Sequence, residues 1–244
     1  MSVRRFFVEP DVIKGDRALL TGDLSHHLCK VLRLSTGDEV LLLDGKGNHY
    51  LSRIEELSGS AGVARITEHW YAAENSLPVR LIQALPKGEK FDLILQKGCE
   101  LGITRFSPVS SERSVPQVAG TRSEKKQQRW QRIVTEAARQ SRRSVLPACD
   151  PIAPFGQVLT ECQEELKLML WEEESVPLSE RLPSTAPAGV AVLVGPEGGF
   201  SAAEAAAAEA AGFLPVSLGP RILRTETSGF AVTAVLEYLY GDFG

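Results

Sequence analysis

Two glycine-rich runs near the carboxyl end of this 244-residue chain have the residue types to bind a small molecule. The first is Gly-Pro-Glu-Gly-Gly-Phe at residues 195–200, and the second is Gly-Pro-Arg-Ile-Leu-Arg-Thr-Glu-Thr at residues 219–227. Glycine has no Cβ, so a ligand can approach its backbone closely. Neither run matches the dinucleotide-binding Gly-x-Gly-x-x-Gly pattern or the P-loop pattern. The pair predicts a small-molecule site of another kind, with ordinary turns as the alternative interpretation.

The segments around these runs predict how both are placed. An apolar stretch at residues 189–194 is typical of a central parallel strand, and a second strand is expected at residues 213–218. Ser201 and Glu204 form a capping box that opens an alanine-rich helix, and the last helix is expected at about residues 228–240. Both runs therefore leave the same edge of a parallel sheet, where open α/β sheets bind their ligands.

The chain divides into a β-rich amino-terminal domain, residues 1–72, and an α/β domain, residues 73–244. The first predicts a small barrel built on a hairpin and one short helix at residues 25–33, with Ser25 as a possible N-cap. The second alternates strands and helices, which predicts a mostly parallel sheet covered by helices. Its other strands are expected at residues 79–85, 104–109 and 166–171, its other helices at 89–101, 123–140 and about 155–162, and a surface loop at 172–188.

Positive charge is concentrated in one segment. The formal net charge of −4 by itself disfavours a nucleic-acid partner. Between residues 122 and 143, however, eight lysines and arginines stand against only Glu124 and Glu136, so this segment carries +6 and the rest of the chain −10. A phosphate backbone responds to local potential, because screening limits the reach of a charge to about 8–10 Å. The segment predicts an RNA-binding helix face, with a solvated face as the alternative.

The cysteines and histidines indicate neither a disulfide framework nor a metal site. The four cysteines lie apart without a Cys-x-x-Cys pair, which fits buried hydrophobic side chains in a reducing, cytoplasmic compartment. The four histidines lack metal-ligand spacing, so no metal is expected. The amino terminus has no apolar signal-peptide region, and no apolar run is long enough to span a bilayer. A soluble cytoplasmic protein with no membrane partner is expected.

The two glycine-rich runs, at this spacing, resemble those of the knotted SPOUT methyltransferases, and within them those of the ribosomal RNA small-subunit methyltransferase E family. That family methylates N3 of one uridine in small-subunit (16S) rRNA. Further segments that fit the family extend the match over nearly the whole chain: residues 4–8, 97–102, 112–114 and 136–141. The chain departs from the family pattern at Arg142, where a glycine is expected, and at residues 228–230, where small apolar residues are usual.

The resemblance implies an α/β fold and a cofactor. It implies a small amino-terminal PUA-like β-barrel that binds RNA, a carboxyl-terminal trefoil-knotted SPOUT methyltransferase domain, and a homodimer. It also implies that the two runs, threaded through one another, bind S-adenosylmethionine, and that 16S rRNA within the small ribosomal subunit is the other partner. The cofactor-binding residues that it implies are Val194, Gly195, Pro196, Glu197, Gly198, Gly199, Leu218, Gly219, Arg221, Ile222, Leu223, Thr225 and Thr227.

Methyl transfer to uridine N3 makes two demands on the protein. Donor and acceptor must be aligned, and good orientation alone contributes about 7–11 kcal/mol. The N3 proton must also leave, which calls for a base or for a donor to the flanking carbonyl oxygens. We expect Glu197 to be the base, with Glu226 as the alternative, unless Glu226 caps the last helix. The uridine anion is expected to be stabilised by Arg139 or Arg224, with Arg221 as a further candidate, unless Arg224 pairs with a carboxylate.

RNA contacts are expected from both domains. Phosphate and sugar contacts are expected from Arg4, Arg5, His27, Lys30, Arg33, Arg113, Arg139, Gln140, Arg142 and Arg143. Phe6 or Phe7 is a candidate for stacking on a base, although core packing is favoured for both. Three functions remain open: methylation of uridine N3 in small-subunit rRNA, methylation of another RNA by a related knotted enzyme, and RNA binding without catalysis. The paired glycine-rich runs disfavour the third, and the near full-length resemblance favours the first over the second.

Overall fold

The computed structural model describes residues 3–74, 77–114, 121–173 and 175–243. The chain forms two compact units, one made of Met1–Glu74 with Ala138–Leu146 and the other of Asn75–Ala137 with Pro147–Gly244. Part of the predicted boundary, at residues 75–76, lies outside the described residues. The segment Ala138–Leu146 lies in the sequence of the predicted second domain but packs with the first unit.

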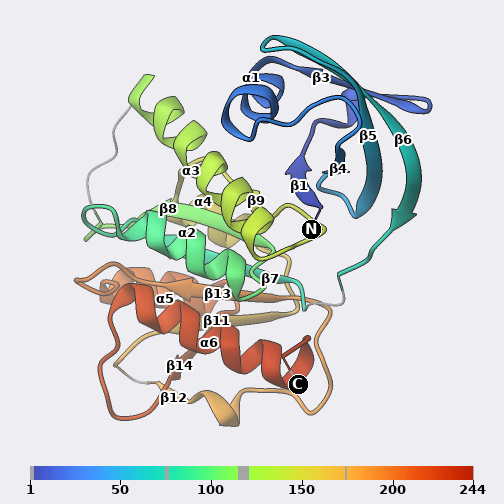
Figure 1. The fold of residues 1–244 in the computed structure, drawn as a ribbon. Helices are drawn as coiled ribbons and strands as arrows, with labels where there is room; N and C mark the ends of the chain where they lie inside the picture. The colour runs from blue at the N-terminus through green and yellow to red at the C-terminus, as the bar shows by residue number, and fades with distance from the viewer. Residues whose placement is uncertain (1–2, 75–76, 115–120, 174, 244) are drawn as a thin grey trace. The chain divides into compact units, whose positions relative to one another are not determined.

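The first unit is a six-stranded mixed sheet around its own core (Figure 1). Strand β1 runs parallel to β4, and the other neighbours pair antiparallel in the order β1–β4–β5–β6–β3–β2. Inward-facing side chains include Phe6, Leu20 and Ile54. The strands are β1 (Arg4–Phe7), β2 (Ile13–Lys14), β3 (Arg17–Thr21), β4 (Glu39–Leu43), β5 (Asn48–Leu57) and β6 (Ala61–Tyr71), and a short 3₁₀ turn, η1, covers Pro10–Val12.

The helix of the first unit differs from the predicted one. It begins earlier, as α1 (Gly22–His26), and continues as a π-helical turn, η2 (His27–Val31). Gly22 has a φ of +56°, which allows strand β3 to turn directly into the helix. Ser25 is not the N-cap, because it is buried inside α1 and its hydroxyl donates to the Ser58 carbonyl at 2.9 Å. The N-cap position is taken by Thr21.

The second unit is a parallel sheet with helices on both faces, as predicted (Figure 1). Its strands follow the order β10–β8–β7–β13–β11–β14–β12, with β9 paired to β8, and every neighbouring pair is parallel. The strands are β7 (Val79–Ala84), β8 (Arg105–Ser110), β9 (Ala148–Cys149), β10 (Ala153–Pro154), β11 (Leu166–Leu170), β12 (Val176–Pro177), β13 (Val190–Val194) and β14 (Leu214–Ser217). The central strand β13 is buried along its whole length, which explains its continuous apolar sequence.

The helices cover the sheet in two layers. Helices α4 and α5 pack on the face that presents Ile82 and Ala84 of β7. Helix α6 packs on the opposite face beside α2, and its Gly229 lies directly against Leu81. Helix α3 packs on α2 through an edge-to-face contact between Trp130 and Phe91. The helices are α2 (Lys90–Glu100), α3 (Thr121–Gln140), α4 (Phe155–Glu161), α5 (Ala202–Ala210) and α6 (Thr225–Tyr240).

Two predicted boundaries in the second unit are wrong. Helix α6 begins at Thr225 rather than at about residue 228, because Arg224 already accepts hydrogen bonds from the amides of Thr227 and Ser228. The predicted loop at 172–188 contains strand β12 and a 3₁₀ turn, η3 (Leu178–Glu180), because β12 extends the sheet by pairing with β14. Across the described ranges, no helix is both long and apolar enough to cross a membrane.

Candidate functional site

The two glycine-rich runs meet at one edge of the second unit's sheet. Strands β13 and β14 flank β11, and both run parallel to it, so the loops that follow them leave the same edge. The hydroxyl of Thr225, at the start of α6, donates to the Gly195 carbonyl at 2.5 Å. The prediction that both runs lie at one sheet edge is confirmed, and a direct hydrogen bond joins them.

The first run forms a tight turn. The Gly199 amide donates to the Pro196 carbonyl at 2.9 Å, and Gly199 has a φ of +67°. A Cβ on Gly195 would lie 3.3 Å from the backbone of Gly199, a tight contact that a larger side chain at residue 195 would make worse. The predicted capping box is confirmed, since Ser201 and Glu204 exchange hydrogen bonds at the start of α5. The run is therefore held in shape by its own backbone and by the helix that follows.

A loop that follows β8 braces the first run from outside. The Arg113 guanidinium donates to the Gly198 carbonyl at 2.8 Å, and the Glu112 amide donates to the Glu204 carboxylate at 2.7 Å. Arg113 was expected to contact RNA, but at least part of its guanidinium holds the glycine turn. Since Arg113 is exposed, its remaining donors still face solvent.

Lys90 joins the two carboxylates that were the candidate bases. Its ammonium lies 2.9 Å from a Glu197 oxygen in the first run and 3.3 Å from a Glu226 oxygen in the first turn of α6. The Lys87 amide also donates to the Glu197 carboxylate, at 3.2 and 3.3 Å. The side chain of Glu226 thus pairs with Lys90, while its negative charge still lies favourably at the helix N-terminus.

Electrostatics at this bridge favour the charged forms. Burial alone would raise the pKa of Glu197, but the hydrogen bonds from Lys90 and from backbone amides outweigh it, so the pKa of Glu197 is lowered. The hydrogen bond to Glu197 in turn raises the pKa of Lys90. Glu197 is therefore an ionised carboxylate whose oxygens already accept hydrogen bonds from Lys90 and the Lys87 amide. This makes Glu197 a weak proton acceptor.

The second run offers backbone groups to a ligand. Within the described parts of the chain, no hydrogen bond uses the backbone N–H or C=O groups of residues 218–223. Gly219 has a φ of +95°, and a Cβ added to Gly219 or to Gly199 would meet no atom within 4 Å. Open space thus borders the backbone of both runs, and unpaired donors and acceptors line one of them. These features fit a nucleoside-containing cofactor such as S-adenosylmethionine.

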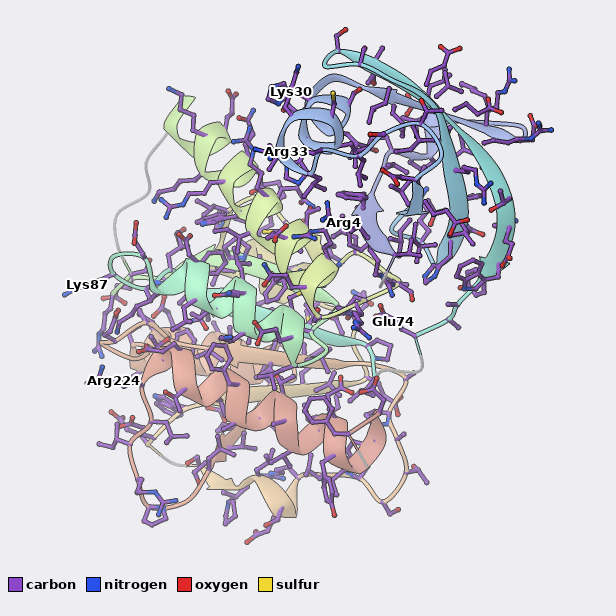
Figure 2. All side chains as sticks on the ribbon, viewed as in Figure 1. Arg4, Lys30, Arg33, Glu74, Lys87 and Arg224 are labelled. Atoms are coloured by element: carbon purple, nitrogen blue, oxygen red, sulfur yellow. The ribbon has the colours of Figure 1, made fainter. Side chains whose placement is uncertain are left out.

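The side chains of the second run mostly face solvent. Gly219, Arg221, Ile222 and Thr227 are exposed, and Leu218 and Leu223 are half-buried. Arg224 is exposed and forms no ion pair or hydrogen bond through its side chain with any described residue, so its pairing with a carboxylate is not seen. Figure 2 shows Lys87 and Arg224 at the same end of the second unit, beside the starts of α2 and α6.

Three residues of this edge escaped the sequence analysis: Gln83, Lys87 and Lys90. Gln83 ends the buried strand β7, and the two lysines follow in the loop and the first turn of α2. The signal was present, because β7 is a neighbour of β13 in a parallel sheet and its loop must leave the same edge. The loop at residues 85–89 was missed because it lacks the glycine-rich pattern of the two runs at residues 195–200 and 219–227.

Several predicted RNA-contacting residues are exposed on the first unit. His27 and Lys30 lie in η2 and Arg33 just after it, and Figure 2 labels Lys30 and Arg33 on this part of the first unit. Arg4 is exposed and donates to the Leu32 carbonyl at 3.3 Å. These side chains remain available to an anionic partner.

Other predicted contacts serve the interior of the first unit. Arg143 is only 8% exposed and pairs with Glu74 at 2.7 Å, so it is not a surface cation. Arg5 donates to the carbonyls of Arg142 and Arg143, and burial, then the charge of Arg142, lower its pKa. Phe6 is buried in the core, which excludes it as a stacking platform, while Phe7 is half-buried.

The segment from α3 onward keeps part of its positive charge exposed. Lys125, Arg132 and Arg142 are exposed, whereas Arg129 pairs with Glu89 and Asp92. The side chain of Arg122, counted in the basic segment, lies outside the described residues. Arg139 is half-buried and Gln140 exposed, and both belong to the segment that packs with the first unit.

The cysteines and histidines form no metal site among the residues that are described. No group of three His, Cys, Asp or Glu side chains there is placed to hold an ion. All four cysteines are free, and Cys99 and Cys162 are buried. Burial raises the pKa of Cys149 and of Cys162 to about 12, so neither is a thiolate at neutral pH.

Comparison with known proteins identifies the class to which this architecture belongs. Residues 73–237 match the model of the RNA methyltransferase domain, and residues 20–67 match the RNA methyltransferase PUA domain. A parallel-sheet unit with two joined glycine-rich loops and a small β-rich unit thus define an RNA methyltransferase with a PUA domain.

Full-length relatives identify the particular family. The chain is 38% identical to a ribosomal RNA small subunit methyltransferase E of Synechocystis, over 96% of this chain and 77% of the relative, and 32% identical to that of Bacillus subtilis, over 98% and 100%. It superposes on the Neisseria gonorrhoeae enzyme of that name bound to S-adenosylmethionine with a TM-score of 0.89 at 33% identity, covering 100% of both chains. A Legionella pneumophila methyltransferase with bound S-adenosylmethionine gives 0.89 at 31% identity, covering 98% of each. The chain belongs to the ribosomal RNA small subunit methyltransferase E family, and the resemblance found in the sequence is confirmed.

Proposed function

We propose that this chain transfers a methyl group from S-adenosylmethionine to N3 of a specific uridine in the 16S rRNA of the small ribosomal subunit. The observation that carries the proposal is the pair of glycine-rich loops joined by Thr225 and Gly195, with open space and unpaired backbone groups beside them. The relatives bear the name of small-subunit rRNA methyltransferases, and two of the similar structures hold the cofactor. Such a substrate places the enzyme in the cytoplasm.

The backbone of the two loops is proposed to hold the cofactor, with threading of one loop through the other as the family implies. Bound S-adenosylmethionine supplies an electrophilic methyl group on a positively charged sulfur. The protein's contribution is orientation, because a methyl displacement needs the acceptor nitrogen in line with the bond that breaks. Leu218 and Leu223 offer unpaired backbone groups, whereas the Gly195 carbonyl already accepts from Thr225. Gly199 permits close approach, while the space beside Gly198 is taken by the Arg113 side chain.

The proton on N3 is the second demand on the chain. Glu197 was expected to remove it, but its lowered pKa and its bond to Lys90 suit it better to holding Lys90 and the loop in place. Arg224 is exposed at the same edge and pairs with no carboxylate among the described residues, which supports Arg224 as the donor to the carbonyl oxygens beside N3. A guanidinium there stabilises the uridine anion and lets the proton pass to solvent. Arg139 remains a second candidate for this role.

RNA binding is proposed to use exposed arginines whose backbone is strained. Among the described residues, Arg33 and Arg142 are the two non-glycine residues with positive φ, at +55° and +60°. Both were expected to bind RNA, and residue 142 is the position where a glycine was expected. A long side chain in this conformation costs about 1–2 kcal/mol, a strain that is typical of functional positions.

A substitution at Arg142 tests this surface. Replacing the exposed Arg142 by glycine, written Arg142→Gly, removes one phosphate contact and relieves strain. The salt slope of RNA binding should then fall by about 0.7–0.9, with stability within about 1 kcal/mol of the parent. Filter binding across a salt series measures the slope, and urea unfolding measures stability. An unchanged slope would remove Arg142 from the RNA surface.

We also propose a homodimer through α6. Val235, Tyr238 and Leu239 form an apolar stripe on that helix at i, i+3, i+4 spacing, with Tyr238 67% and Leu239 49% exposed. Ile222, in the second run, is 79% exposed. We propose that a second copy of the chain covers this stripe, because the family implies a dimer. In a two-fold symmetric dimer the same surface of both copies meets, so one such stripe is enough. Light scattering on the parent and on Tyr238→Asp checks it: a dimer that becomes a monomer supports the proposal, and a monomeric parent refutes it.

One experiment tests the main proposal. Small-subunit rRNA from a strain lacking the gene is digested with nuclease and examined by mass spectrometry, with and without the restored protein. A single 3-methyluridine should be lost and then regained. Loss of a different methylated nucleotide would point to the related knotted enzymes, and no change in methylation would leave RNA binding without catalysis.

A further inference from the structure

A buried amide lies beneath the two loops. Gln83 is the fifth residue of β7 and is 1% exposed, among buried neighbours Leu81, Ile82 and Ala84. Its side chain faces the α6 side of the sheet, where it reaches Thr225. A polar side chain at such a core position needs a reason, because an apolar one would pack there without any desolvation cost.

The contacts of this amide fix its orientation. The Nε2 atom lies 2.9 Å from the Thr225 hydroxyl oxygen and 3.3 Å from the Gly195 carbonyl oxygen. It also lies 3.0 Å from the Ala84 carbonyl and 3.5 Å from the Val194 carbonyl. The three carbonyl oxygens accept only, so the nitrogen and not the oxygen of the amide must face them.

The hydrogen bonds therefore run in one direction. The single hydroxyl proton of Thr225 is donated to Gly195, which leaves the hydroxyl oxygen to accept from Gln83. The result is a relay from β7 through the first turn of α6 to the first glycine-rich run. It connects three segments that are far apart in the sequence.

The other end of the amide is unsatisfied. Gln83 Oε1 is buried and has no hydrogen-bond partner among the described residues. An unpaired buried carbonyl oxygen is costly, so the side chain is poorly optimised for stability alone. What the amide uniquely supplies is the link through Thr225 to the glycine-rich run.

We propose that Gln83 and Thr225 are positioning residues for the cofactor, a role that rests on the proposed function. They hold the Gly195 carbonyl against the start of α6, so that the backbone groups of both runs keep the spacing that the cofactor needs. Thr225 then acts through the loop and not by contact, since it is 7% exposed and its hydroxyl proton is committed. Gln83 was not among the residues that the sequence singled out.

A pair of threonines in α6 supplies the test. Thr233 is also buried, and its hydroxyl donates to the Gly229 carbonyl at 2.8 Å, the same kind of bond without any link between loops. Calorimetric titration with S-adenosylmethionine is carried out on the parent, Thr225→Val, Thr225→Ser and Thr233→Val, with melting temperatures recorded for each. We expect Thr225→Val to weaken affinity at least tenfold, and Thr225→Ser and Thr233→Val to stay within about twofold of the parent. The turnover number should change less than the KM for the cofactor.

The outcomes separate this inference from the function on which it rests. A parent that does not bind S-adenosylmethionine refutes the proposed function. A parent that binds, with Thr225→Val binding equally well, refutes the positioning role and leaves the function standing. Equal weakening by Thr225→Val and Thr233→Val would show a general stability effect and also overturn the role. Gln83→Leu, alone and combined with Thr225→Val, completes a double-mutant cycle: the two changes should be less than additive, and additive losses would contradict the relay.

Discussion

In the second unit's sheet, the described buried polar side chains around Arg80 at the amino ends of the strands (the amino edge) are fully paired, whereas those around Gln83 at the carboxyl ends (the carboxyl edge) are not. At the amino edge, the buried Arg80 donates to Ser107 at 2.8 Å and lies 3.9 Å from Asp150 and 3.6 Å from Glu164. Ser107 in turn donates to Asp150 at 2.5 Å. No buried side-chain atom of this network lacks a hydrogen-bond partner in the described chain.

At the carboxyl edge, the polar groups are incompletely paired. Gln83 Oε1 has no described partner, Arg224 is exposed, and the backbone of residues 218–223 forms no hydrogen bond with the described residues. Lys90 links Glu197 and Glu226 while remaining partly open to solvent. The closed network leaves no buried polar side-chain atom of its described residues unpaired, whereas the open one keeps polar groups available to ligands. This contrast predicts that changes at the two edges affect different measurements.

The largest effect on stability is expected at the amino edge. Arg80→Met leaves Asp150 and Glu164 without their buried cation, and it should lower the free energy of unfolding by about 3 kcal/mol. The affinity for S-adenosylmethionine should stay unchanged, because the two edges lie at opposite ends of the strands. Urea unfolding and calorimetric titration measure the two quantities. Arg105→Met is the control, since Arg105 is 48% exposed and its bond to Asp150 should contribute less than about 1 kcal/mol.

The largest effect on binding is expected at the carboxyl edge. Gly195→Val places a branched side chain where even a Cβ lies 3.3 Å from Gly199, so we expect the turn to be displaced. Cofactor affinity should fall at least 100-fold, about 2.7 kcal/mol. Gly189→Val, just before the amino end of the same strand, is the control and should leave affinity unchanged. Equal affinity of the Gly195→Val protein and the parent would separate the first run from the cofactor.

A smaller effect is expected from the Lys90 bridge. Lys90→Met removes the cation between Glu197 and Glu226, whose charges then repel each other across the two loops. Affinity for S-adenosylmethionine should fall about tenfold, or about 1.4 kcal/mol, and Lys90→Arg should restore most of it. Lys97→Met is a matched control on the same helix, because Lys97 pairs with Glu100 at the same 2.9 Å. A loss of affinity in both variants would mean that α2 as a whole, not the bridge, supports the loops.

The features that the sequence predicted depend on residues close together in the chain, and the features that it missed depend on contacts between distant residues. Local patterns predicted the strand β13, the capping box at Ser201 and the common edge of the two runs, because each depends on neighbouring residues. The partner of Arg143 and the amide of Gln83 were not predictable, since Glu74 and Thr225 lie 69 and 142 residues away. The early start of α6 escaped for a related reason: the Thr225 hydroxyl donates to the Gly195 carbonyl, 30 residues away, and no local pattern reveals that contact.

The smallest expected effect is a pH dependence that tells the two edges apart. The folded protein lowers the pKa of Glu197 below its unfolded value of about 4.3, so the ionised carboxylate stabilises the fold above that pH. This stability should be lost as the pH falls through the folded pKa, and cofactor affinity should weaken in the same range because the bridge to Lys90 weakens. Burial alone would raise the pKa of Glu164, but hydrogen bonds and the charge of Arg80 outweigh it and lower this pKa, so the amino edge should lose stability on acidification without loosening the loops. Melting temperature and affinity for S-adenosylmethionine are measured between pH 3.5 and 7 on the parent, Glu197→Gln and Glu164→Gln. We expect the pH dependence of affinity to be weaker than in the parent only in Glu197→Gln. Were Glu164→Gln to flatten the affinity profile as well, the two networks would be coupled through the sheet and the contrast between its edges would fail.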